Sequence, residues 1–93
     1  MVSRTVAIGS ASGLHARPAA LFVAAAAAQP VKVTIRTGER KAVPARSILS
    51  VLALCAVHGT EVTLEAEGDG AQSAVDALAE LLARDLDAEH ADA

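Results

Sequence analysis

The chain of 93 residues has almost no aromatic side chains and only one cysteine. Phe22 is the single aromatic residue, which excludes an aromatic stacking platform for single-stranded nucleic acid. Cys55 stands alone, which excludes an intrachain disulfide framework and a multi-cysteine zinc site. We therefore expect a cytoplasmic protein that needs no metal and no cofactor.

The length leaves no room for a second independent core. Apolar residues make up 53% of the chain, but 23 of these 49 residues are alanines, so only 26 larger apolar side chains remain. That number suffices for one two-layer domain. We expect a single domain over residues 1–88, followed by an acidic, disordered tail over residues 89–93.

Charge and hydropathy exclude two classes of partner. Residues 1–60 carry seven basic side chains and one acidic, whereas residues 61–93 carry one basic and ten acidic, giving net charges of +6 and −9. The basic half is too sparse to predict nucleic-acid binding. The apolar run Ala19–Ala28 is shorter than the ~20 residues that span a bilayer, and it predicts a helix buried on one face rather than a membrane insertion or a secretory signal.

Hydrophobic periodicity and turn residues predict seven elements in the order β-α-β-β-α-β-α. We expect strands over residues 2–8, 31–37, 41–43 and 60–67, and helices over residues 16–28, 47–57 and 71–86. Ser47 is a natural N-cap for the second helix. Because each element has one apolar face, the chain should fold as a two-layer α+β sandwich, with three helices on one face of a four-stranded antiparallel sheet.

The segment Gly13-Leu14-His15-Ala16-Arg17-Pro18 lies at the predicted start of the first helix. Pro18 fits the first helical turn, where backbone N–H groups have no acceptor within the helix. His15 then lies near the N-cap, and the N–H groups of Ala16 and Arg17 point outward as donors. The helix dipole and the Arg17 guanidinium add positive charge. The segment therefore predicts an anion site beside an imidazole.

An imidazole at an anion site suits phosphoryl chemistry, because neutral histidine has a lone pair that can attack phosphorus. Two other interpretations of His15 remain. It can be an ordinary residue at a helix start, with Pro18 an ordinary helix starter. It can also be the general base of a small anion-binding enzyme, although no second catalytic group is evident in the sequence.

The same residues resemble the HPr family, the histidine-containing phosphocarriers of the bacterial sugar phosphotransferase system. Gly13–Ala19 is similar to the family's active-centre motif, and the stretches Ser47–Leu54 and Gly59–Val62 are similar to a second conserved region. The resemblance covers about Val2 to Leu86 and implies the same β-α-β-β-α-β-α fold. It implies that His15 accepts a phosphoryl group at Nδ1 and that Arg17 stabilises that group.

The resemblance also implies partners. Phosphorylated enzyme I would donate the phosphoryl group to this chain, which would pass it to the A domains of sugar-specific enzymes II during sugar uptake. Ile48, Leu49 and Leu52 fall where the family has its apolar docking patch. Ser47 matches the regulatory serine that an ATP-dependent kinase modifies in many relatives. The chain would act as a monomeric carrier rather than as an independent turnover enzyme.

Two alternatives to the general sugar carrier stay open: a paralogue that serves a specialised branch, and a regulatory docking module controlled at Ser47. The sequence departs from the family at Pro44, at Ser50, and at Cys55, where glycine is common. We expect Cys55 to be a small buried residue and His58 to lie at a helix end. A further histidine, His90, lies in the acidic tail, and we expect its side chain to be solvated rather than to bind a metal.

Overall fold

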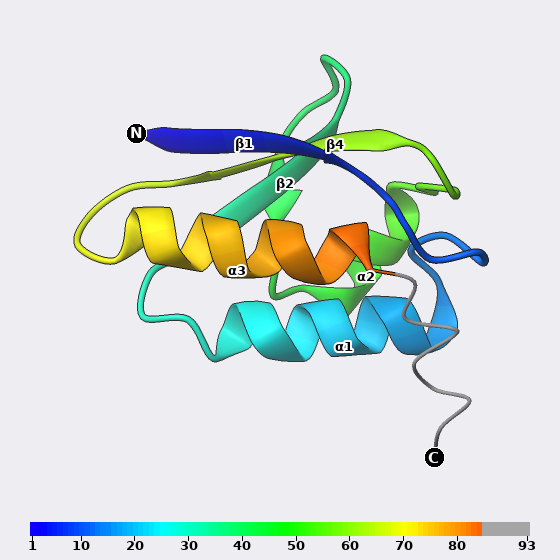
Figure 1. The fold of residues 1–93 in the computed structure, drawn as a ribbon, viewed down its shortest axis with the longest axis horizontal. Helices are drawn as coiled ribbons and strands as arrows, with labels where there is room; N and C mark the ends of the chain where they lie inside the picture. Colours follow the sequence, from blue (N-terminus) through cyan, green and yellow to red (C-terminus); the bar gives the residue numbers. More distant parts are fainter. Residues whose placement is uncertain (85–93) are drawn as a thin grey trace.

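The structure is a computed structural model that describes residues 1–84 (Figure 1). Its elements are β1 (Val2–Ala7), α1 (Ala16–Ala27), β2 (Val33–Thr37), β3 (Val43–Pro44), α2 (Ile48–Ala53), β4 (Glu61–Ala66) and α3 (Ala71–Ala83). The expected order β-α-β-β-α-β-α is thus confirmed. The domain boundary expected at residue 88, the tail 89–93 and His90 lie outside the described residues.

The four strands form one antiparallel sheet in the order β1-β4-β2-β3. The central strand β4 pairs with β1 on one side and with β2 on the other. All three helices lie on one face of the sheet, with α3 against β1 and β4 and α1 packed between α2 and α3 (Figure 1). The expected α+β sandwich is therefore confirmed.

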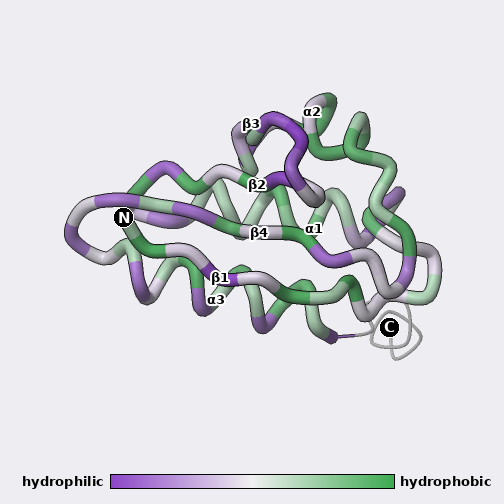
Figure 2. The backbone as a smooth tube through the Cα atoms, turned by 90° about the horizontal axis from the view of Figure 1, so that it is seen from above, coloured by the Kyte–Doolittle hydropathy of each residue, from purple (hydrophilic) through white to green (hydrophobic). Residues whose placement is uncertain are grey.

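The core lies between the sheet and the helices because each element presents one apolar face there. Alternate residues of β4 are buried, as are three residues of the α3 stripe, and these are Val62, Leu64, Ala66, Val75, Leu78 and Leu82. The fourth predicted member of that stripe, Leu86, lies outside the described residues. The more hydrophilic segments lie around β3 and at the end of β4 that leads to α3 (Figure 2).

The run of alanines forms α1, whose buried residues are Pro18, Ala19, Phe22 and Ala26. These residues recur at the three- to four-residue spacing of one helix face. None of the helices within residues 1–84 is long and apolar enough to cross a membrane. The sequence run therefore belongs to a packed helix of twelve residues.

The second helix is shorter than expected. It ends at Ala53, not at Val57, and the N–H of Cys55 donates to the carbonyl oxygen of Leu52 in a tightened last turn (3.2 Å). Cys55 adopts φ +54, a left-handed conformation that stops a helix. The expectation that Cys55 is buried is also wrong, because this turn leaves it exposed. His58 accordingly lies in a loop and not at a helix end.

The short strand β3 lies one to two residues later than expected, at Val43–Pro44 rather than at residues 41–43. The preceding turn closes through a hydrogen bond from the Arg40 N–H to the Thr37 carbonyl oxygen (3.0 Å). Pairing with β2 is then fixed by the Ala45 N–H, which donates to the Val33 carbonyl oxygen (2.9 Å). This long-range bond sets the register of β3.

Candidate functional site

His15 is the N-cap of α1, as the sequence predicts. Its backbone is extended (φ −130°, ψ 164°), and its side chain makes no capping hydrogen bond to the helix. The imidazole is exposed. A histidine in this position caps the helix through its backbone alone, so its ring nitrogens are available to react with a partner molecule.

The first amides of α1 are available to bind an anion. The first hydrogen bond at this end runs from the Ala19 N–H to the His15 carbonyl oxygen (3.4 Å). Within residues 1–84, neither the N–H of Ala16 nor that of Arg17 has an acceptor. Such donors and the positive end of the helix dipole favour a bound phosphate. Ala16 itself has φ +47°, a strained conformation for a residue with a side chain.

The loop that carries His15 is clamped against the segment that follows α2. The Leu14 N–H donates to the Ala56 carbonyl oxygen (2.8 Å). Gly13 has φ +74°, and a Cβ atom at this position would lie 2.5 Å from the same oxygen and 2.8 Å from the Cα of Val57. Only glycine fits both the conformation and the space. The side chain of Leu14 is buried in the core, so the backbone that leads into His15 is held in place.

The other end of this loop is clamped as well. The Gly9 N–H donates to the Leu82 carbonyl oxygen at the end of α3 (2.8 Å), and a Cβ atom at Gly9 would lie 2.1 Å from the Ala83 carbonyl oxygen. The Gly59 N–H donates to the Ile8 carbonyl oxygen (2.8 Å). The His15 loop therefore rests on two segments that are distant in the sequence.

Arg17 is exposed on the first turn of α1 and forms no ion pair within the described part of the chain. Two other arginines are engaged. Arg4 pairs with Asp76 (3.1 Å) and Arg36 with Glu65 (3.8 Å). Among residues 1–84, these two ion pairs join the basic and acidic halves of the sequence, and the Arg17 guanidinium is left available for an anion.

The expected docking patch lies on α2, which packs against α1. Leu49 is 79% exposed and Ile48 39% exposed, while Leu52 is half-buried. One further apolar side chain, Val57, is 58% exposed on the segment that contacts Gly13. The sequence analysis missed Val57 because it extended the helix to this residue.

Ser47 is the N-cap of α2, as expected. Its Oγ accepts a hydrogen bond from the Ser50 N–H (3.4 Å). Its side chain is half-buried and borders the first residues of the docking patch. This capping role accounts fully for a serine at this position.

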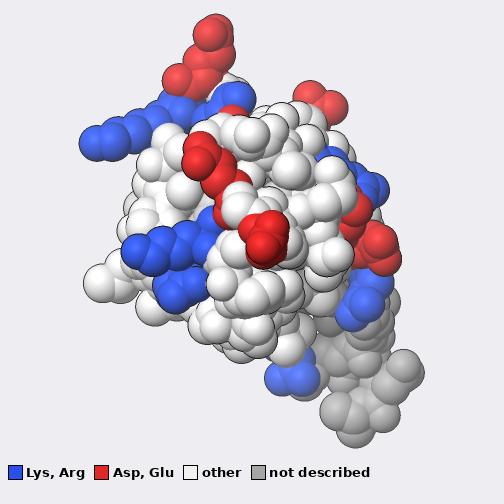
Figure 3. All heavy atoms as spheres, turned by 90° about the vertical axis from the view of Figure 1, so that its left-hand side faces the viewer, with Lys and Arg blue, Asp and Glu red and all other residues white. Residues whose placement is uncertain are grey.

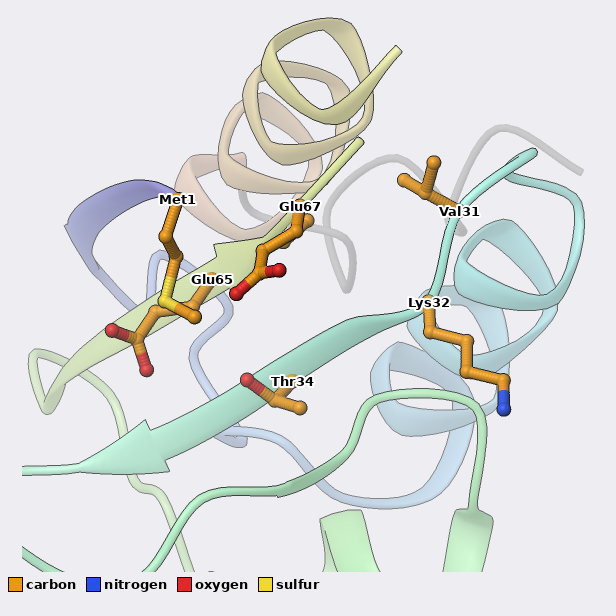
Figure 4. Close-up of a pocket in the computed structure, with 7 residues that line it drawn as sticks. Met1, Val31, Lys32, Thr34, Glu65 and Glu67 are labelled. Carbon is orange, nitrogen blue, oxygen red and sulfur yellow. The ribbon is translucent and has the colours of Figure 1, made fainter. Parts of the chain in front are cut away.

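Three grooves of the described surface, of about 280–400 Å³, lie away from His15 and are lined by neither His15 nor Arg17. The largest of them is bordered by Met1, Lys32, Glu65 and Glu67, among others (Figure 4). Residues 1–84 also contain no group of three or more metal-ligating side chains. His15 and Arg17 are both exposed and lie outside these three grooves.

Comparison with known proteins agrees with this geometry. Residues 2–84 match the family model for the PTS HPr component phosphorylation site. The phosphocarrier protein HPr of Streptomyces coelicolor is 46% identical over 87 residues, covering 94% of each chain. The HPr-like protein Crh of Bacillus subtilis is 42% identical over 79 residues, 85% of this chain and 92% of that protein.

The fold agrees with solved structures of the same group. A crystal structure of HPr from Thermoanaerobacter tengcongensis superposes with a TM-score of 0.82 at 39% identity, covering 88% of this chain and 91% of the other. The sequence match, the fold and the placement of His15 at a helix start all agree with one protein family. The chain belongs to the HPr family of phosphocarrier proteins.

Proposed function

We propose that this chain accepts a phosphoryl group on Nδ1 of His15 from phosphorylated enzyme I and passes it to the A domains of sugar-specific enzymes II. It does so as a monomer in the cytoplasm. The observation that carries this proposal is the exposed imidazole of His15, which makes no capping bond and stands beside two amides without an acceptor. Membership of the HPr family supports it.

The transfer step begins when the lone pair of the His15 imidazole attacks the phosphorus atom. The nitrogen–phosphorus bond forms while the bond from phosphorus to the donor's leaving atom breaks, and the leaving group keeps that electron pair. The amides of Ala16 and Arg17 and the Arg17 guanidinium stabilise the charge on the phosphoryl oxygens. The second transfer reverses these roles, with the imidazole as the leaving group.

The docking patch of Ile48, Leu49 and Leu52 supplies the apolar contact that orients both partners. Their exposure on α2, which packs on the helix that begins at His15, supports this role. The same partners bring their reacting groups to the open surface at His15. Basic residues near the site, such as Arg17, favour partners with acidic surfaces.

The test is the intact mass of the protein after incubation with enzyme I and phosphoenolpyruvate. We expect one acid-labile phosphoryl group, which is lost in His15→Ala and kept in His58→Ala, a matched control because His58 is also exposed. An unchanged gain in mass in His15→Ala would refute the assignment.

Arg17→Ala should slow phosphoryl transfer about tenfold or more and leave the free energy of unfolding unchanged. An unchanged rate would remove the role of Arg17.

A second candidate is a regulatory docking module controlled by phosphorylation of Ser47, and the similarity to Crh favours its consideration. A kinase that uses ATP would add about 1.5–2 negative charges beside the docking patch and would weaken contacts with acidic partners. This phosphate would be acid-stable, whereas that on His15 is acid-labile. Incubation of wild type and Ser47→Ala with such a kinase separates the two functions.

A further inference from the structure

Four basic side chains lie along the β3 edge of the sheet and are not used by the site at His15. This basic edge consists of Lys32, Arg40, Lys41 and Arg46. All four are exposed, and none of them forms an ion pair within residues 1–84. From Lys41 to Arg46 the extended chain spans at most about 17 Å. Like charges this close repel each other, and no carboxylate within residues 1–84 pairs directly with any of the four.

Two of these cations border one groove. Lys32 and Arg46 line a groove of about 280 Å³ with Thr34 and Pro44, where β2 pairs with β3. The side chain of Lys32 extends away from Glu65 and Glu67, so those nearby carboxylates do not neutralise it (Figure 4). The groove thus offers two cations, a hydroxyl group and an apolar ring to a ligand.

The groove lies far from His15. The twelve residues of α1 separate His15 from the segment that leads to Lys32, a distance of about 18 Å along the helix axis. Figure 1 shows α1 beginning at one end of the molecule and finishing at the other. Figure 3 looks onto that second end and shows Lys and Arg side chains on both sides of it, with Asp and Glu side chains between them. A molecule bound there leaves the imidazole uncovered.

The edge strand cannot recruit another strand at its centre. The Ala45 N–H points to β2, where it donates to the Val33 carbonyl oxygen. Because successive N–H groups of a strand point in opposite directions, the nitrogen of Pro44 faces the open edge, and it carries no hydrogen. A ligand on this edge is therefore held by the side chains and not by an added β-strand.

We propose that the basic edge binds an acidic segment of a protein partner through its carboxylates, at the same time as His15 exchanges its phosphoryl group. Carboxylates fit the two flanking cations, and an apolar residue of the segment would cover the ring of Pro44. This contact is independent of the chemistry at His15, so the partner is one that senses or localises the carrier without interrupting transfer.

The test is a titration of the full ¹⁵N-labelled chain with a hexaglutamate peptide whose ends are blocked, followed by amide chemical shifts. We expect saturable shifts centred on the amides of residues 32–34, 45 and 46, with an affinity that falls as salt is added. Lys32→Gln/Arg46→Gln should weaken binding about three- to tenfold. The control Arg4→Gln/Arg36→Gln removes the same charge from two paired arginines and should change binding by less than about twofold.

Four results would overturn the proposal. One is an equal loss of binding in the two double variants, which would show unspecific attraction by net charge. Another is a set of shifts centred on residues 16–20, which would place the peptide at the His15 anion site. The third is tighter binding of a single-stranded DNA oligonucleotide or of anionic vesicles than of the peptide. Labelling of His15 by enzyme I in the presence of bound peptide should proceed unchanged, and its inhibition would contradict simultaneous binding.

Discussion

Substitution of Gly13 by alanine should damage both the stability of the protein and the placement of His15. Two separable costs arise. At φ +74° an alanine is strained by about 1–2 kcal/mol. Its Cβ atom would also lie 2.5 Å from the Ala56 carbonyl oxygen, and relief of that overlap costs about 1–3 kcal/mol more. The total is about 2–5 kcal/mol, against a stability of about 5–14 kcal/mol for a chain of 93 residues.

Two other glycines separate these costs. Gly38 has φ +53° with no atom within 4 Å of an added Cβ, so Gly38→Ala should lose only the conformational part, about 1–2 kcal/mol. Gly9 does not have a positive φ, yet an added Cβ would lie 2.1 Å from the Ala83 carbonyl oxygen. Gly9→Ala should therefore lose only the steric part, about 1–3 kcal/mol.

Urea unfolding of the three variants measures these differences. With a slope of about 1 kcal/mol per M, Gly13→Ala should lower the midpoint by about 2 M or more, and Gly38→Ala by about half as much. Phosphoryl transfer from enzyme I should also slow in Gly13→Ala, because the loop must move away from Ala56, while Gly38→Ala keeps the wild-type rate. If Gly13→Ala were no less stable than Gly38→Ala, the close approach to Ala56 would not exist in solution and the clamp on His15 would be wrong.

Three further predictions concern single side chains. Cys55→Gly should stabilise the chain by about 1 kcal/mol, because it relieves φ +54° at an exposed position, and a lower melting temperature would contradict this. Thr37→Val should leave stability unchanged or raise it by about 1 kcal/mol, since the buried Thr37 hydroxyl has no partner within the described residues; a loss above that size in urea unfolding would reveal a missing partner. Ser47→Ala should cost about 1 kcal/mol through loss of the cap on Ser50, whereas Ser47→Asp should restore most of it, and equal loss in both would argue against capping.

The helices and strands were predictable where local pattern and packing agree. The alternation in β4 and the stripe of α3 identify their buried faces directly, and both faces are buried in the fold. The end of α2 was not predictable in this way. Apolar residues continue past Ala53, but the left-handed turn at Cys55 redirects them, and this turn is rare for a residue that is not glycine.

The candidate site was predictable in part. His15 at the N-cap follows from the position of Pro18, since proline is tolerated in a first turn. The hydrogen bonds that hold the loop could not be predicted. They join Leu14 to Ala56 and Gly9 to Leu82, residues that are 42 and 73 positions apart in the sequence (56 − 14 and 82 − 9). Such pairs depend on how whole elements pack, which no short window of sequence contains.

The open placement of His15 has a consequence for how such a chain can change over time. The exposed His15 ring does not itself select the shape of the protein that binds to it. The pocket that distinguishes one recipient protein from another must therefore belong to the recipient. A new recipient protein can therefore arise by acquiring a pocket for the His15 ring and an apolar surface that contacts Leu49, with no change in this chain. Because every existing recipient contacts the same few residues around His15, all of them together limit which substitutions these residues can accept.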